Sequence, residues 1–209
     1  HMDGSVLDVH GRNALHLAAR RGAVDIVTAL CTNPRAHRGD DDGSTPLHLA
    51  VQNNHLSTVC TLLPYSNVNH QTFNGITAIH SAASLGYFEI IKVLLQDGAD
   101  SELTCQRGWT PVMAACCVNC TRSLRLLLTA GAEPDRINAS GRTALMIAAS
   151  LNNVEVVRIL LETGVDINYT TLFGLNALQS SDGNAVTQLL LRYDVDLNGV
   201  YDIYPTWTP

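Results

Sequence analysis

The hexapeptide Thr45-Pro46-Leu47-His48-Leu49-Ala50 recurs in altered form at five other places along the chain. In each copy a glycine stands two residues before the threonine position, and successive glycines are separated by 32, 32, 33, 33 and 33 residues. Steps this regular predict an array of like units, each adding the same local structure. The leading glycines are Gly11, Gly43, Gly75, Gly108, Gly141 and Gly174.

Each unit predicts a pair of short helices. The threonine position can cap a helix, and proline at 46 and 111 then occupies the first helical position, where its missing N–H costs nothing. A helix of small residues follows, and then a second helix with bulky aliphatic residues at helical spacing, as at 90–95, 124–128 and 156–161. Gly98, Gly131 and Gly164 predict the ends of three of these second helices.

This pattern closely resembles the ankyrin repeat, whose signature is the start Thr-Pro-Leu-His-x-Ala. Residues 45–50 match that start in full, Gly98-Ala99-Asp100 matches the family's ending, and the resemblance covers roughly residues 8–198. It implies an all-α solenoid of about six stacked helix-turn-helix repeats, with projecting β-turns and a concave face lined by the turns and the first helices. We therefore expect residues 1–209 to form a single ankyrin-repeat domain, with repeats starting near 8, 40, 72, 105, 138 and 171.

Some segments depart from the pattern. The link at 33–42 lacks the usual ending and predicts an atypical loop, and the second repeat ends in Pro64-Tyr65-Ser66 where others carry glycine. The sixth repeat is three residues short near 181–183, which predicts a shortened helix pair. Residues 199–209 are either the start of a seventh repeat or a terminal hairpin.

Composition restricts the classes of function. A net charge of −6, from 13 basic and 19 acidic residues, disfavours direct nucleic-acid binding, which needs a basic surface. The chain has no apolar run long enough for membrane insertion. The six unevenly spaced cysteines do not form a disulfide framework and favour a reducing, intracellular location, cytoplasmic or nuclear. We expect a monomer.

Two sets of reactive side chains have structural interpretations. By the resemblance, His16, His48 and His80 bond backbone groups of the next turn. Cys117 and Cys120 form a Cys-x-x-Cys pair, but a zinc site would need a second pair at matching spacing. No phosphate loop, nucleophile motif or paired catalytic carboxylates are present in the sequence. We therefore expect no enzyme activity, no catalytic residue, no cofactor and no metal.

The resemblance implies that a partner would be bound on the concave face, at positions beside each leading glycine and nine to ten residues after it. Aromatic and arginine side chains are favoured in binding hot spots. The alternative is that neighbouring turns simply pack these side chains against one another. The predicted protein-binding residues are Arg12, Arg20, Asp42, Phe73, Ile76, Arg107, Trp109, Arg142 and Phe173.

The function that follows is a protein–protein interaction module, a regulatory scaffold that binds a peptide or a folded partner. The alternative is the targeting part of a larger regulator, such as a ubiquitin-ligase substrate receptor or a transcriptional inhibitor. The identity of the partner is not encoded in any motif of the chain.

Overall fold

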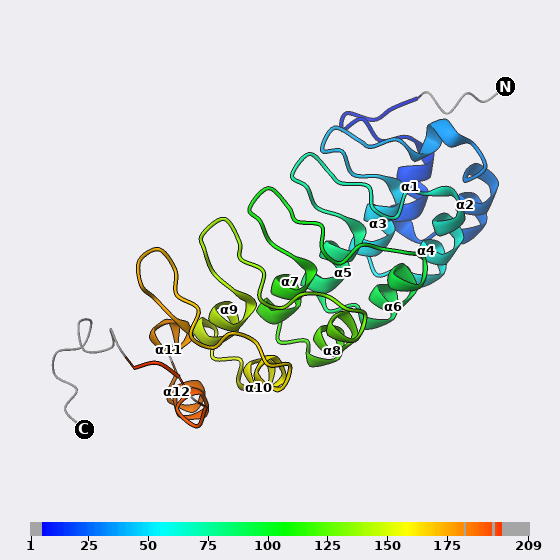
Figure 1. Ribbon diagram of the computed structural model, residues 1–209. Helices are drawn as coiled ribbons and strands as arrows, with labels where there is room; N and C mark the ends of the chain where they lie inside the picture. Colours follow the sequence, from blue (N-terminus) through cyan, green and yellow to red (C-terminus); the bar gives the residue numbers. More distant parts are fainter. Residues whose placement is uncertain (1–5, 182, 194, 198–209) are drawn as a thin grey trace.

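The computed structural model describes residues 6–181, 183–193 and 195–197, and this part of the chain is helical and contains no strand. The helices lie in two layers along an elongated array (Figure 1). The first helices of the six repeats are α1 (Ala14–Arg21), α3 (Pro46–Gln52), α5 (Ala78–Leu85), α7 (Pro111–Cys117), α9 (Ala144–Ser150) and α11 (Ala177–Ser180). The second helices are α2 (Val24–Leu30), α4 (Leu56–Leu62), α6 (Phe88–Gln96), α8 (Thr121–Thr129), α10 (Val154–Glu162) and α12 (Asn184–Leu190).

The first helices begin where the sequence predicts. Thr77, Thr110 and Thr143 have extended backbone, and their side chains accept from the backbone N–H three residues later. Pro46 and Pro111 are the first helical residues of α3 and α7. These caps satisfy N–H groups that the helix itself leaves unpaired, so the starts are defined locally.

Each helix pair buries its apolar face only by stacking on the next pair, as is typical of solenoids. First helices pack against first helices and second against second along the whole array. Fully buried alanines, including Ala50, Ala82 and Ala148, let the first helices approach closely, while Leu94 and Leu127 fill the space beside the second helices. The all-α solenoid expected from the repeats is confirmed.

Each repeat begins with a turn that projects from the helices on one side of the array (Figure 1). A backbone hydrogen bond closes each of them, and the six projecting turns are 8–12, 40–44, 72–76, 105–109, 138–142 and 171–175. Together with the first helices they form what we call the turn face. The leading glycine has a positive φ in every turn, for example 77° at Gly43 and 74° at Gly174, which explains why glycine recurs there.

Histidines link the first four repeats. Nε2 of His16 donates to the carbonyl oxygen of Ser44 at 3.0 Å, and His48 and His80 reach Ile76 and Trp109 in the same way at 3.1 and 3.0 Å. Burial lowers the pKa of all three rings, that of His48 to about 4. The structural interpretation of these histidines is confirmed.

The first five projecting turns are also joined to one another by backbone hydrogen bonds. These run from Asp41 N to His10 O at 3.1 Å, Phe73 N to Asp42 O at 3.0 Å, Gln106 N to Asn74 O at 2.9 Å and Ala139 N to Arg107 O at 2.9 Å. No corresponding bond joins the fifth turn to the sixth within the described residues. The sixth turn therefore lacks the main-chain link that holds the other five together.

The departures from the repeat pattern have structural counterparts. The link 33–42 contains a short 3₁₀ helix (Pro34–His37), and a second one (Leu63–Tyr65) ends the second repeat. The helix α11 has only four residues, in keeping with the deletion near 181–183. Residues 199–209, the predicted seventh repeat or hairpin, lie outside the described residues.

Candidate functional site

The nine predicted binding residues all lie on or beside the turn face, but they differ in how free their side chains are. Arg20, Asp42 and Arg107 are exposed, as are the rings of Phe73 and Phe173, at 69% and 89%. Arg12, Ile76, Trp109 and Arg142 are half-buried.

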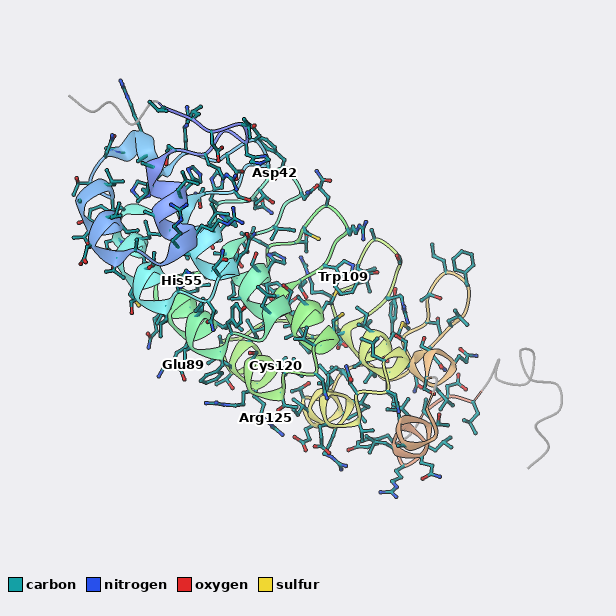
Figure 2. The ribbon with its side chains drawn as sticks, turned by 180° about the vertical axis from the view of Figure 1, so that it is seen from behind. Asp42, His55, Glu89, Trp109, Cys120 and Arg125 are labelled. Atoms are coloured by element: carbon teal, nitrogen blue, oxygen red, sulfur yellow. The ribbon has the colours of Figure 1, made fainter. Side chains whose placement is uncertain are left out.

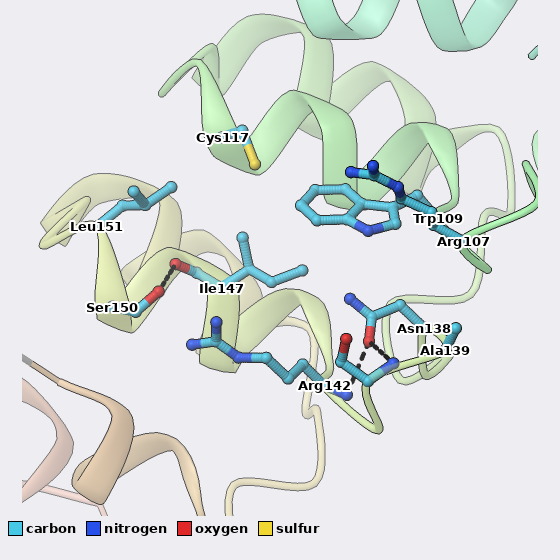
Figure 3. Close-up of a pocket in the computed structure, with 10 residues that line it drawn as sticks. Arg107, Trp109, Cys117, Asn138, Ala139, Arg142, Ile147, Ser150 and Leu151 are labelled. Carbon is cyan, nitrogen blue, oxygen red and sulfur yellow. Dashed lines mark hydrogen bonds between the residues drawn. The ribbon is translucent and has the colours of Figure 1, made fainter.

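Three of the nine residues come together at one groove between the fourth and fifth repeats. Arg107 and Trp109 belong to the fourth projecting turn and Arg142 to the fifth (Figure 3). The groove has a volume of about 540 Å³. Its remaining lining residues are Cys117, Asn138, Ala139, Ser140, Ile147, Ser150 and Leu151.

Trp109 stands at the junction between the turn and α7. Its carbonyl oxygen accepts from His80, and its half-buried indole packs against the hydrophobic core. One part of the ring is therefore exposed, as the binding prediction requires. The other part is packed against the core, as the alternative expected. The equivalent positions in the second and third repeats carry Ser44 and Ile76, so the framework does not require an aromatic side chain here.

The opposite wall of the groove is held by Asn138. Its side-chain oxygen accepts from the backbone N–H groups of Ser140 and Arg142, at 2.9 and 3.0 Å (Figure 3). The guanidinium of Arg142 makes a weak contact of 3.4 Å with the Met146 carbonyl oxygen. The shape of the fifth turn is thus set by a buried asparagine, and the arginine beside it keeps most of its hydrogen-bonding capacity.

The groove is positively charged. None of its ten lining residues is acidic and two are arginines, in a chain whose net charge is −6. Burial raises the pKa of the Cys117 thiol, while Arg142 acts in the opposite direction, so this thiol remains protonated and neutral at pH 7.

The other predicted residues are not part of this groove. Arg12 forms an ion pair of 2.9 Å with Asp8 in its own turn, so its charge is already compensated. Asp42 contributes its carbonyl oxygen to the bond from Phe73 N, and its side chain is exposed. Phe173 lies with the fully exposed Leu172 on the sixth turn. A binding role for these residues stays a prediction.

Ile147 and Asn138 line the groove although the predicted set does not contain them. Ile147 is 4% exposed and occupies the variable position of the repeat signature, where other repeats carry leucine, serine or alanine. Asn138 is 6% exposed and acts through the turn backbone. The sequence signal for Ile147 is weak, because Leu17 and Leu49 are also large aliphatic residues at that position. The role of Asn138 depends on contacts that no motif displays.

The described residues contain neither a metal site nor a disulfide. They contain no group of three or more histidine, cysteine or acidic side chains placed to hold a metal ion. The six cysteines carry no disulfide, and Cys116 is buried in the core as predicted. Within the described part of the chain, no helix combines the length and apolar character that crossing a membrane requires.

The chain is similar to known proteins along nearly all of its length. The family model of ankyrin repeats, in blocks of three copies, matches residues 2–72, 62–138, 79–171 and 119–201. The B-cell lymphoma 3 protein homolog of Mus musculus is 36% identical over 122 residues, which are 54% of this chain and 26% of that protein. The ankyrin repeat and SOCS box protein 3 of Homo sapiens is 35% identical over 101 residues, 46% of this chain and 20% of that protein.

A solved structure has the same architecture. The crystal structure of the ankyrin repeat domain of Bcl-3, described as a unique member of the IkappaB protein family, superposes with a TM-score of 0.81 at 26% identity. The superposition covers 91% of this chain and 86% of that one. By contrast, the matched segments are only 26% and 20% of the lengths of the two curated relatives.

Proposed function

The chain belongs to the ankyrin-repeat family, and we propose that it is a protein–protein interaction module whose main contact is the groove around Trp109. The observation that carries this proposal is the groove itself, which presents part of a tryptophan and two arginines on the turn face. Tryptophan and arginine are the residues most enriched in binding hot spots. Half-buried aromatic rings beside a hollow also lose little conformational entropy when a partner covers them.

The repeats hold this surface rigid. The bonds from His80 to Trp109 and from Ala139 to Arg107 keep the fourth turn fixed between its neighbours. A preorganised surface spends less of its interaction free energy on ordering when it binds. The remaining expectations form part of the same proposal: the chain is monomeric, resides inside the cell, has no catalytic activity and does not bind nucleic acid directly.

The proposal is tested by affinity capture from cell lysate with quantitative mass spectrometry. Wild type is compared with the single variants Trp109→Ala and Arg107→Glu and with Tyr65→Ala, an exposed aromatic of the 3₁₀ helix Leu63–Tyr65. We expect the proteins captured by wild type to be lost with both groove variants and retained with Tyr65→Ala. Thermal melting of each variant separates lost binding from lost folding.

Two outcomes would contradict the proposal. Equal capture by wild type and both groove variants would exclude the groove as the main contact. Failure of folded wild type to retain any protein above the background of the resin would contradict the interaction module itself.

The targeting part of a larger regulator is a second candidate. The observation in its favour is that the matched segment is only 26% and 20% of the two relatives, so those proteins carry their repeats within longer chains. The larger regulator would be a ubiquitin-ligase substrate receptor or a transcriptional inhibitor. Capture with the product of the complete gene would favour this candidate if it recovers proteins that the 209-residue chain does not.

A further inference from the structure

Within the part of the chain that the structure describes, neither arginine of the groove forms an ion pair with a carboxylate. The described residues contain ion pairs at Arg12, Arg125, Arg136 and Arg158, and none of these involves Arg107 or Arg142. Two uncompensated guanidinium groups beside a hollow therefore create a local positive field in an acidic protein.

The acidic residue that precedes each of these arginines in the sequence is engaged elsewhere. Glu102 contacts Arg136 at 3.7 Å and accepts from the backbone N–H of Glu133 at 3.0 Å. Asp135 accepts from the backbone N–H of Asp166 at 3.2 Å. These carboxylates form the links between successive repeats, so they are not available to neutralise the groove.

An apolar surface accompanies the charge. The lining includes the indole of Trp109 and the side chains of Ile147 and Leu151, the last of them 49% exposed (Figure 3). A ligand that covers this surface would exclude water from the neighbouring guanidinium groups. Charge-assisted hydrogen bonds to arginine strengthen as the surroundings become less polar, and a carboxylate matches the fork of a guanidinium.

We propose that the groove recognises a partner segment in which an acidic side chain stands next to an aromatic or aliphatic one. The acidic side chain would bond Arg107 or Arg142, and the apolar side chain would cover Trp109 and Leu151. This inference rests on the proposed interaction function and adds the chemistry of the partner.

The charge of the rest of the turn face favours a peptide over nucleic acid. Asp41 and Asp42 are exposed on the second projecting turn (Figure 2 labels Asp42 and Trp109). A long polyanion lying along the row of turns would meet these carboxylates after leaving the arginines. A short segment with one or two acidic residues contacts the groove alone and avoids that repulsion.

The test is selection from a random-peptide display library, with the purified chain as bait. We expect wild type to enrich peptides with aspartate or glutamate beside an apolar residue. The double variant R107E/R142E should lose these peptides, with affinities at least about tenfold weaker, and should favour peptides with lysine or arginine. The matched control R125E/R158E alters net charge equally on the second helices and should select the same peptides as wild type.

Each of the following outcomes would overturn the inference of an acidic partner segment. The first is enrichment of peptides that lack acidic residues but still require Trp109 for binding. This result would contradict the acidic partner but not the proposed function as an interaction module. Selection unaffected by R107E/R142E, or no enrichment at all, would also overturn the inference. Binding of a single-stranded oligonucleotide that depends on the same two arginines and exceeds that of the selected peptides would replace the peptide with nucleic acid.

Discussion

The first three junctions between repeats and the last two are built differently on the same fold. At the first three, a histidine donates to the carbonyl of the next turn and the projecting turns share a backbone bond. At the fourth junction Met113 replaces the histidine but the backbone bond remains. At the fifth, Met146 is present and the described residues show no bond between the turns.

This difference shows which interactions the solenoid needs. Helix packing continues across all five junctions, and Met113 and Met146 are 1% and 0% exposed. Stacking of the repeats therefore does not require the histidine links or the backbone bonds between turns, which add rigidity to the junctions that contain them. The candidate groove lies at the fourth junction, the first without a histidine link.

The largest expected effect comes from adding a methyl group to a projecting turn. A Cβ at Gly43 would lie 2.9 Å from Phe73 N, whereas one at Gly174 has no atom within 4 Å. Both positions have positive φ and carry a strain of about 1 kcal/mol in alanine. We expect Gly43→Ala to lower the free energy of unfolding by about 3 kcal/mol, since overpacking is added, and Gly174→Ala by about 1 kcal/mol. Urea denaturation measures both, and equal losses would contradict the close approach of Phe73 to Gly43.

The second largest effect is expected on acidification, which should destabilise the first three junctions more than the last two. Burial lowers the pKa of His48 to about 4 from 6.5, and lowers those of His16 and His80. The unfolded chain therefore binds more protons below pH 6.5, and the stability present above that pH is lost as the pH falls towards 4. For His48 alone the loss at pH 5 is about 2 kcal/mol.

Hydrogen exchange at pH 7 and pH 5, corrected for intrinsic rates, locates this loss. We expect α1, α3 and α5 to lose protection while α9 and α10 keep most of theirs. Uniform loss of protection along the array would contradict the assignment to the histidine links.

Installing the missing link should give a smaller, favourable effect. Met113 occupies the position of His48 and follows Thr110, whose side chain caps α7 as Thr77 caps α5. We expect Met113→His to donate to the Arg142 carbonyl oxygen and to stabilise the chain by about 1 kcal/mol at pH 7. The gain should vanish at pH 5. Met113→Leu controls for the loss of methionine packing, and no gain over this variant would show that the fourth junction cannot accommodate the link.

The smallest effect is expected from a kind of hydrogen bond that occurs both among the first three junctions and among the last two. Asn69 accepts from the Asp100 N–H at 2.8 Å, and Asp135 accepts from the Asp166 N–H at 3.2 Å, both at the surface. Asn69→Ala and Asp135→Ala should each cost less than about 1 kcal/mol, to a similar extent. Markedly unequal costs in urea denaturation would extend the difference between the regions beyond the turn face.

Much of the fold was predictable because its determinants are local. Capping by Thr77 and Thr110, the first-position proline at Pro111 and the positive φ at Gly43 depend on residues within a few positions of one another. The shortened sixth repeat was also visible as a deletion. The candidate site was only partly predictable, since sequence position identified Trp109 and both groove arginines but did not separate them from the compensated Arg12.

The sequence by itself determined the repeat length, the helix pairs, the turns and the family. Only the tertiary structure decided that Arg107, Trp109 and Arg142 share one groove with Ile147, and that the carboxylates of Glu102 and Asp135 are engaged elsewhere. The physical reason is the separation along the sequence of the residues that interact. Caps and turns form within a few residues, whereas each wall of the groove and each compensating charge comes from a neighbouring repeat, so its position depends on how the repeats stack.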